Sequence, residues 1–239
     1  MVGDIHGTNE IPAAFGEYVC AAAATYGGKT MVALELGSSQ ADRVQAALRS
    51  EEDARTALAD TAFRSGHRDG RVTEAILELL VRLGELKELG MDIEVVPYQS
   101  VSAATADAFR RGENPQPFLE KDYADVVLAA AQGADRTIVM SGSIHAMKAP
   151  GNPAFVTFDP MASHFPDGTI SMLVLHDGGT RWGLTGGESK EHTVSPSSQP
   201  KVQDYPQFVF DSSLDPQFDG YLTVGLITAA HPPQKDPAD

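Results

Sequence analysis

The sequence predicts an α/β fold: a mostly parallel central sheet with helices on both faces, followed by an antiparallel C-terminal extension. Three short apolar runs, at residues 29–36, 92–98 and 136–140, alternate with segments of helical periodicity over the first 145 residues. That alternation is typical of a parallel sheet covered by helices. After residue 145 the pattern changes to short strands, which we expect at 154–158, 170–176, 180–184 and 221–228.

Helices are predicted over residues 10–26, 38–48, 51–63, 73–89, 102–111 and 117–132. The signal is clearest over 73–89, because Ile76, Leu80 and Leu83 recur at helical spacing, with Thr73 before the first turn as a capping residue. The polar, glycine-punctuated segment 65–71 is predicted to be a loop.

All these elements fit one domain over residues 1–230, since 239 residues suit one large α/β domain. A domain boundary near Pro150 is the alternative. Residues 186–219, rich in Ser, Pro, Gln and Asp, are expected to form a long surface loop, and residues 231–239 a flexible tail. A strand is expected before His6, although only five residues precede it. A processed, truncated or misassigned N-terminus is therefore one interpretation of the sequence.

Charge and composition exclude several classes of partner. The net charge is -15, with 18 Lys and Arg against 33 Asp and Glu, which disfavours nucleic acid and anionic membrane surfaces. Cys20 is the single cysteine, so neither an internal disulfide nor a cysteine-based zinc site is expected. No apolar run is long enough for a transmembrane helix. A periplasmic and a cytoplasmic location are both compatible with these features.

Polar side chains follow four successive predicted strands, where each strand ends. They are Asp4 and His6, then Glu35, then Tyr98 and Gln99, and finally Ser141, Ser143 and His145. Ligands of open α/β sheets bind beyond the carboxyl ends of the strands. The sequence therefore predicts that these side chains line one crevice.

Glu35 has the most informative position of this set. It lies inside the apolar run Met31-Val-Ala-Leu-Glu-Leu36, where a carboxylate must be paired, metal-bound or protonated. The alternative is an edge strand with Glu35 in solvent. His6 and His145 both occur as Gly-x-x-His, and glycine lets a chain turn sharply off a strand. Locally packed histidines are the alternative there.

The segment His67-Arg-Asp-Gly-Arg71 supplies two cations and a carboxylate, which could bind an anion or orient a catalytic carboxylate. A solvated loop is the alternative. The motifs of nucleophile elbows, phosphate-binding loops and His-Glu-x-x-His zinc enzymes do not occur, so a serine nucleophile is not expected.

Four segments carry a family resemblance: Gly3-Asp-Ile-His-Gly-Thr-Asn-Glu10, the strand end Ala33-Leu-Glu35, Arg68-Asp-Gly-Arg71 and Gly142-Ser-Ile-His-Ala146. Over about residues 1–185 the chain resembles the superfamily that joins erythromycin esterases, ChaN-like haem-binding proteins and TIKI/TraB proteins, in an uncharacterised bacterial branch. The resemblance implies an α/β fold with its site at the strand ends. Asp4 stands where that superfamily usually has Glu, and Ser143 where it usually has Asn.

The first functional hypothesis is a hydrolase of an ester, lactone or amide in a small-molecule or peptide substrate. One histidine, oriented by Glu35 or Asp4, takes a proton from water, while the other, with Arg71, stabilises the oxyanion. The candidate catalytic residues are His6, Glu35, His145, Asp4 and Arg71. The candidate substrate-binding residues are Glu10, Asp69, Tyr98 and Ser143.

Other hypotheses remain open beside it. A divalent metal is one, with His6, Glu35 and His145 as three ligands, and the TIKI/TraB resemblance allows it. Haem binding without catalysis is another, with a histidine or Tyr98 as the iron ligand. A member of the superfamily that binds a partner and catalyses nothing is the last.

Overall fold

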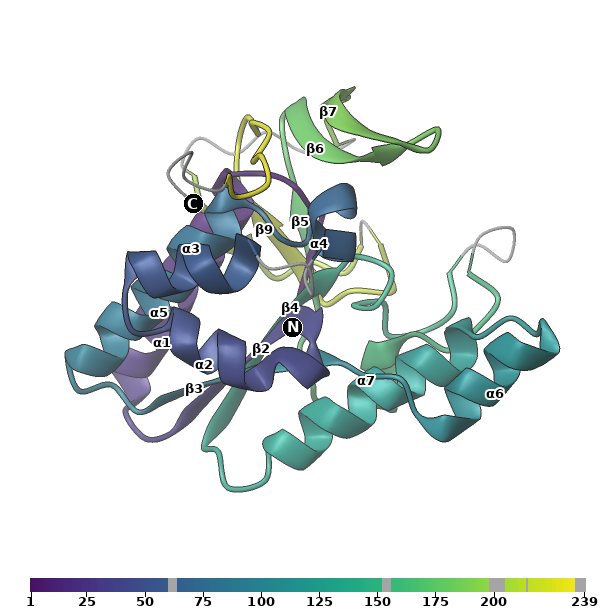
Figure 1. Ribbon diagram of the computed structural model, residues 1–239, viewed down its shortest axis with the longest axis horizontal. Coiled ribbons are helices and arrows are strands. Elements are labelled where there is room, and N and C mark those ends of the chain that lie inside the picture. Colours follow the sequence, from purple (N-terminus) through teal and green to yellow (C-terminus); the bar gives the residue numbers. More distant parts are fainter. Residues whose placement is uncertain (60–63, 152–155, 198–204, 214, 235–239) are drawn as a thin grey trace.

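A seven-stranded sheet in the order β3-β2-β4-β1-β5-β9-β8 forms the centre of the molecule (Figure 1). The computed structural model describes residues 1–59, 64–151, 156–197, 205–213 and 215–234. The strands are β1 (Val2–Asp4), β2 (Thr30–Gly37), β3 (Ile93–Gln99), β4 (Arg136–Gly142), β5 (Met172–Leu175), β8 (Gln207–Val209) and β9 (Gly220–Thr223). Neighbours in this sheet pair in parallel, except that β8 is antiparallel to β9. The predicted α/β class is confirmed.

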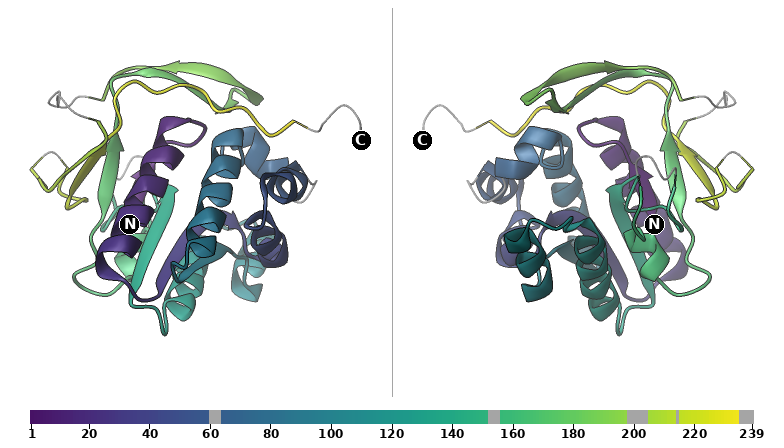
Figure 2. Two further views of the ribbon diagram at one scale, coloured as in Figure 1. Left: turned by 90° about the vertical axis from the view of Figure 1, so that its left-hand side faces the viewer. Right: turned by 90° about the vertical axis from the view of Figure 1, so that its right-hand side faces the viewer.

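Helices cover both faces of the sheet (Figure 2). They are α1 (Glu10–Tyr26), α2 (Ala41–Ala47), α3 (Glu51–Ala59), α4 (Arg64–Asp69), α5 (Glu74–Glu88), α6 (Ala103–Arg111) and α7 (Gln116–Ala130), with short 3₁₀ turns η1 (Ser38–Gln40) and η3 (Met161–His164). The predicted helices are therefore present with small changes at their ends, and residues 60–63 of the third lie outside the described residues. None of the described helices is long and apolar enough to span a membrane.

Strand β2 is buried on both faces, which explains its nearly continuous apolar run. On one face α1 and α5 pack side by side and contribute Phe15 and Leu80 to the larger core cluster. On the other face α7 contributes Tyr123 and Val127, which pack near Met31 of β2 in the second cluster. This two-sided packing buries Glu35, near the end of β2, at the sheet's carboxyl edge, between β3 and β4.

The C-terminal part departs from the prediction in two ways. Strands β5 and β9 were expected in an antiparallel extension, yet they extend the parallel sheet beside β1. The prediction of a surface loop over 186–219 is wrong for residues 188–194 and 207–209, which form β7 (Glu188–Val194) and β8, while residues 198–204 and 214 of that range lie outside the described part. The β7 strand is polar and largely open to solvent, so its composition resembles that of a loop. The antiparallel part consists of the separate hairpin of β6 (Gly179–Thr185) with β7, and of the β8–β9 pair.

Two further predictions concern segments that the structure describes in part. Residues 156–158 of the strand expected at 154–158 do not form a strand, and residues 154–155 lie outside the described part. Residues 231–234 of the expected tail have no helix or strand, while 235–239 lie outside it. The single-domain assignment stays a prediction.

The predicted loop 65–71 is wrong over most of its length, because residues 64–69 form α4. The helix ends at Gly70, which has a φ of +89°. Its backbone there lies against Gly7 and against Trp182 of the hairpin: a Cβ at Gly70 would lie 2.6 Å from the Trp182 carbonyl oxygen. The Trp182 amide also donates to the Gly7 carbonyl at 2.8 Å. Glycine at both positions lets the hairpin cross close to the loop that follows β1.

Candidate functional site

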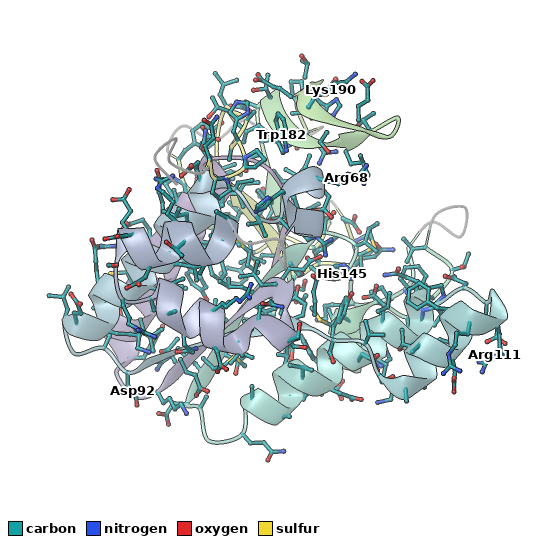
Figure 3. The ribbon with its side chains drawn as sticks, viewed as in Figure 1. Arg68, Asp92, Arg111, His145, Trp182 and Lys190 are labelled. Carbon is teal, nitrogen blue, oxygen red and sulfur yellow. The ribbon has the colours of Figure 1, made fainter. Side chains whose placement is uncertain are left out.

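The carboxyl ends of β2, β4 and β1 lie next to one another, and their side chains meet at Glu35. Asp4, His6, Glu35 and His145, which the sequence places at separate strand ends, form one connected cluster. Figure 3 shows His145 between α7 below it and the β6–β7 hairpin, with Trp182, above it. The edge-strand alternative for Glu35 is wrong, because β2 pairs on both sides.

The Glu35 carboxylate is only 8% exposed and faces two imidazoles. Its Oε2 lies 3.5 Å from Nε2 of His6, and its Oε1 lies 3.5 Å from Nε2 of His145. The backbone amide of Gly142 donates to Oε2 at 2.7 Å. The Tyr98 hydroxyl and the Gln99 amide donate from β3 at 3.4 and 3.3 Å. Glu35 is thus the centre to which groups from three other strand ends connect.

Each histidine has a carboxylate on its other ring nitrogen. Nδ1 of His6 lies 3.0 Å from Oδ1 and 3.2 Å from Oδ2 of Asp4, a buried group. Nδ1 of His145 lies 2.9 and 2.8 Å from the two oxygens of Glu120, which has no exposed surface. A carboxylate on Nδ1 fixes the orientation of an imidazole and stabilises its protonated form. Two such pairs converge on one glutamate.

Glu120 was missed by the sequence prediction. It lies on α7, where it also accepts from the Met161 amide at 2.8 Å and from the Gln116 side chain at 2.6 Å. The available signal was its spacing, because Glu120, Tyr123 and Val127 recur on the buried face of the helix. A carboxylate on such a face requires a partner.

The charges of the cluster shift one another's pKa values strongly. Burial by itself would lower the pKa of His6, but Asp4 and Glu35 outweigh it and raise that pKa well above 6.5. Burial also opposes the charge on His145, and hydrogen bonds to Glu120 and Glu35 raise its pKa to about 10. Burial would raise the pKa of Glu35, yet the two histidines hold it well below its usual value. Glu35 is therefore an anion between two basic imidazoles.

Burial also raises the pKa of the other acid in the cluster, Asp4, against the opposing effect of His6. The phenol of Tyr98 is fully buried, and this together with the charge of Glu35 raises its pKa well above 10. Tyr98 therefore acts as a neutral hydrogen-bond donor to Glu35.

The other site residues predicted from the sequence lie at different distances from the cluster. Arg71 lies beside the cluster, with Nη1 3.7 Å from Oε1 of Glu35, and its Nε donates to Asp69 at 2.9 Å. Ser143 contributes its backbone amide, which donates to the Asp4 carbonyl at 3.0 Å. Glu10 is not joined to the cluster by any described contact, because its carboxylate accepts from the amide and hydroxyl of Thr228. A substrate-binding role for Glu10 therefore has no geometric support.

A narrow cavity of about 20 Å³ adjoins His6, Glu35 and Arg71, which is room for about one water molecule. Gly142 lies against the cluster, since a Cβ there would lie 3.1 Å from Nε2 of His6. Among the residues that the structure describes, no group of three or more His, Cys, Asp or Glu side chains is arranged to hold a metal ion. The mechanism proposed below therefore uses the side chains of the cluster alone.

Comparisons with known proteins place this architecture among solved structures. The sequence matches no protein-family model and no curated protein. A Bacillus cereus protein matches with a TM-score of 0.64 at 10% identity, over 98% of this chain and 89% of that one. A succinoglycan biosynthesis protein matches with a TM-score of 0.62 at 12% identity, over 96% and 88% of the two chains.

The third similar structure is a mutant of the erythromycin esterase EreC in its open conformation. Its TM-score is 0.59 at 12% identity, over 98% of this chain and 92% of that one. The shared property is the fold. At such low identities the likeness concerns the arrangement of strands and helices, and activity has to be argued from the site itself.

Proposed function

We propose that this protein is a hydrolase that attacks an ester, lactone or amide carbonyl with water. One observation carries the proposal: two carboxylate–histidine pairs, Asp4–His6 and Glu120–His145, direct their Nε2 atoms at opposite oxygens of the buried Glu35. A base held by an acid on its far nitrogen, next to a second charged imidazole, suits acyl transfer to water. The fold shared with an erythromycin esterase supports this reaction class by analogy.

His6 in its neutral form is the general base in this mechanism, and that form becomes more abundant as the pH rises, because the pKa of His6 is raised well above 6.5. Its Nε2 accepts a proton from water, and Asp4 stabilises the imidazolium that forms. Glu35 is a weaker choice of base, because the histidines hold its pKa well below the usual value. The water oxygen bonds to the carbonyl carbon, and the C=O electrons move to oxygen. When the tetrahedral intermediate collapses, the proton on His6 passes to the leaving oxygen or nitrogen.

His145 and Arg71 supply positive charge for the oxyanion. Hydrogen bonds to Glu120 and Glu35 raise the pKa of His145 to about 10, so that ring stays protonated at neutral pH. Arg71 adds a permanent cation, oriented by Asp69 through its Nε. Donors in a buried site stabilise a developing anion more strongly than they would in water, because the local dielectric constant is lower.

Haem capture is the less supported alternative. Both ring nitrogens of His6 and of His145 face carboxylates, which leaves neither ring directed at an open axial position. The hydrolase proposal therefore ranks first.

The test is hydrolysis of a panel of p-nitrophenyl esters, lactones and anilides by the wild-type chain and matched variants. His6→Gln is expected to lower kcat by about 100- to 10,000-fold, as for loss of a general base. His145→Gln is expected to lower it by about 100- to 1,000-fold, as for loss of an oxyanion donor. His192→Gln is the control, because His192 lies on the hairpin and bonds the Gly183 carbonyl.

The control is expected to keep wild-type turnover. Turnover that survives both site substitutions contradicts the proposal, and so does a wild-type chain that hydrolyses none of the three substrate classes. Circular dichroism of each variant separates loss of chemistry from loss of fold.

A further inference from the structure

Two buried hydroxyl groups near the site have no hydrogen-bond partner among the described residues. They belong to Thr8, in the loop after β1, and Thr73, directly before α5, and each residue is only 1% exposed. Buried polar groups are normally paired, because leaving one unpaired costs the free energy of its lost hydration. Two such hydroxyls in one place therefore indicate a polar ligand.

Thr73 shows the clearest departure from its expected role. It occupies the N-cap position of α5 with extended backbone angles, φ -138° and ψ 170°, as a capping threonine does. Its side chain nevertheless makes no capping hydrogen bond. Its carbonyl serves the helix instead, accepting from the amides of Ile76 and Leu77. The hydroxyl is thus left available for another partner.

Both threonines line the cavity that adjoins the candidate catalytic cluster. The same cavity is lined by His6, Glu35 and Arg71, and its volume of about 20 Å³ admits about one water molecule. A buried water needs two to four polar partners, and the residues that line this cavity carry two unpaired hydroxyls besides the charged groups. The start of the 15-residue helix α5 contributes the positive end of its dipole, which favours a developing hydroxide.

We propose that Thr8 and Thr73 bind the hydrolytic water and hold it beside His6. This inference rests on the proposed hydrolase function and adds the position of the nucleophile. The hydroxyls orient the water so that one O–H points to Nε2 of His6 and a lone pair is free for the substrate carbonyl. The two threonines are water-positioning residues, and the proton still moves to His6.

The kinetic test uses Thr8→Val and Thr73→Val, which remove a hydroxyl at nearly constant volume. Each is expected to lower kcat about fivefold, the value of one hydrogen bond, with KM changed less than about twofold. Thr8→Ser and Thr73→Ser retain the hydroxyl and are expected to restore most of the turnover. Thr169→Val is the control, because its hydroxyl bonds the Pro166 carbonyl and Thr169 does not line this cavity.

Methanol added as a competing nucleophile separates positioning from a structural effect. Loss of a specific water site is expected to raise the ratio of methyl ester to acid in both valine variants. A structural defect would lower both products in proportion. If kcat and this ratio stay at wild-type values in both variants while His6→Gln is inactive, the water site is refuted and the hydrolase proposal stands.

Thermal unfolding tests the same site without any substrate. If the hydroxyls hold a water, each valine substitution breaks a buried hydrogen bond and lowers Tm. If they hold nothing, the substitution removes an unpaired polar group and raises Tm. A raised Tm in both variants would overturn the inference whatever the activity of the chain.

Discussion

Replacing Glu120 with glutamine removes one negative charge from a fully buried position and nearly preserves the shape of the side chain. Glu120 contacts Nδ1 of His145 through both oxygens, at 2.8 and 2.9 Å. The rise of the His145 pKa from 6.5 to about 10 corresponds to about 5 kcal/mol of stabilisation of the charged ring, shared by Glu120 and Glu35. Removing one partner of a buried ion pair costs about 3 to 5 kcal/mol, and we expect the lower value here, because Glu35 still faces the ring at 3.5 Å.

The sign of the pH dependence follows from the direction of the shift. Because the folded-state pKa of His145 is raised, the stabilisation is fully present below pH 6.5 and is lost as the pH rises through about 10. Glu120→Gln is therefore expected to be about 3 kcal/mol less stable than wild type at pH 7. That deficit is expected to shrink between about pH 8 and pH 10, where the wild-type ring loses its proton.

Urea denaturation followed by circular dichroism at several pH values measures this difference. Glu113→Gln is the matched control, because Glu113 pairs with Arg111 on the exposed end of α6 and should change stability by less than about 0.5 kcal/mol. A deficit for Glu120→Gln that stays constant from pH 7 to pH 10, or that equals the control, would refute the assignment of the pair.

Two other predictions concern activity. The kcat/KM of the wild-type chain should keep rising with pH beyond 6.5, because the base His6 has a raised pKa. It should fall again as His145 loses its proton near pH 10. A profile that levels off at pH 6.5 would exclude His6 as the base and His145 as the oxyanion donor. Gly142→Ala places a methyl group 3.1 Å from Nε2 of His6 and 3.6 Å from Oε2 of Glu35, so turnover is expected to fall at least about tenfold with an unchanged circular dichroism spectrum. Wild-type turnover in that variant would show that the contact can relax.

Much of the fold could be predicted from local patterns. The apolar run of β2 and the helical spacing before Gly90 identify elements directly, because burial on one or two faces leaves a period in the sequence. The pairing of β5 and β9 beside β1 could not be predicted, since the sequence of a short strand does not indicate which strands it pairs with. The polar β7 was hidden for a related reason: a strand with little buried surface lacks the apolar signal.

The candidate site likewise has one part that the sequence predicts and one part that depends on tertiary packing. By itself the sequence determined that Asp4, His6, Glu35 and His145 meet, because parallel strands bring their carboxyl ends to one edge. Only the tertiary structure decided which carboxylate each histidine faces, because Glu120 comes from a helix packed across the sheet and no local period encodes that contact.

The same reason applies to the two threonines of the cavity. Thr73 has the sequence position of a helix cap, and the sequence predicts that role for its hydroxyl. Its availability for a water, with that of Thr8, depends on how α5 packs against the loop after β1. Strand ends are a property of the chain, whereas partners across a packed interface exist only once the elements have assembled.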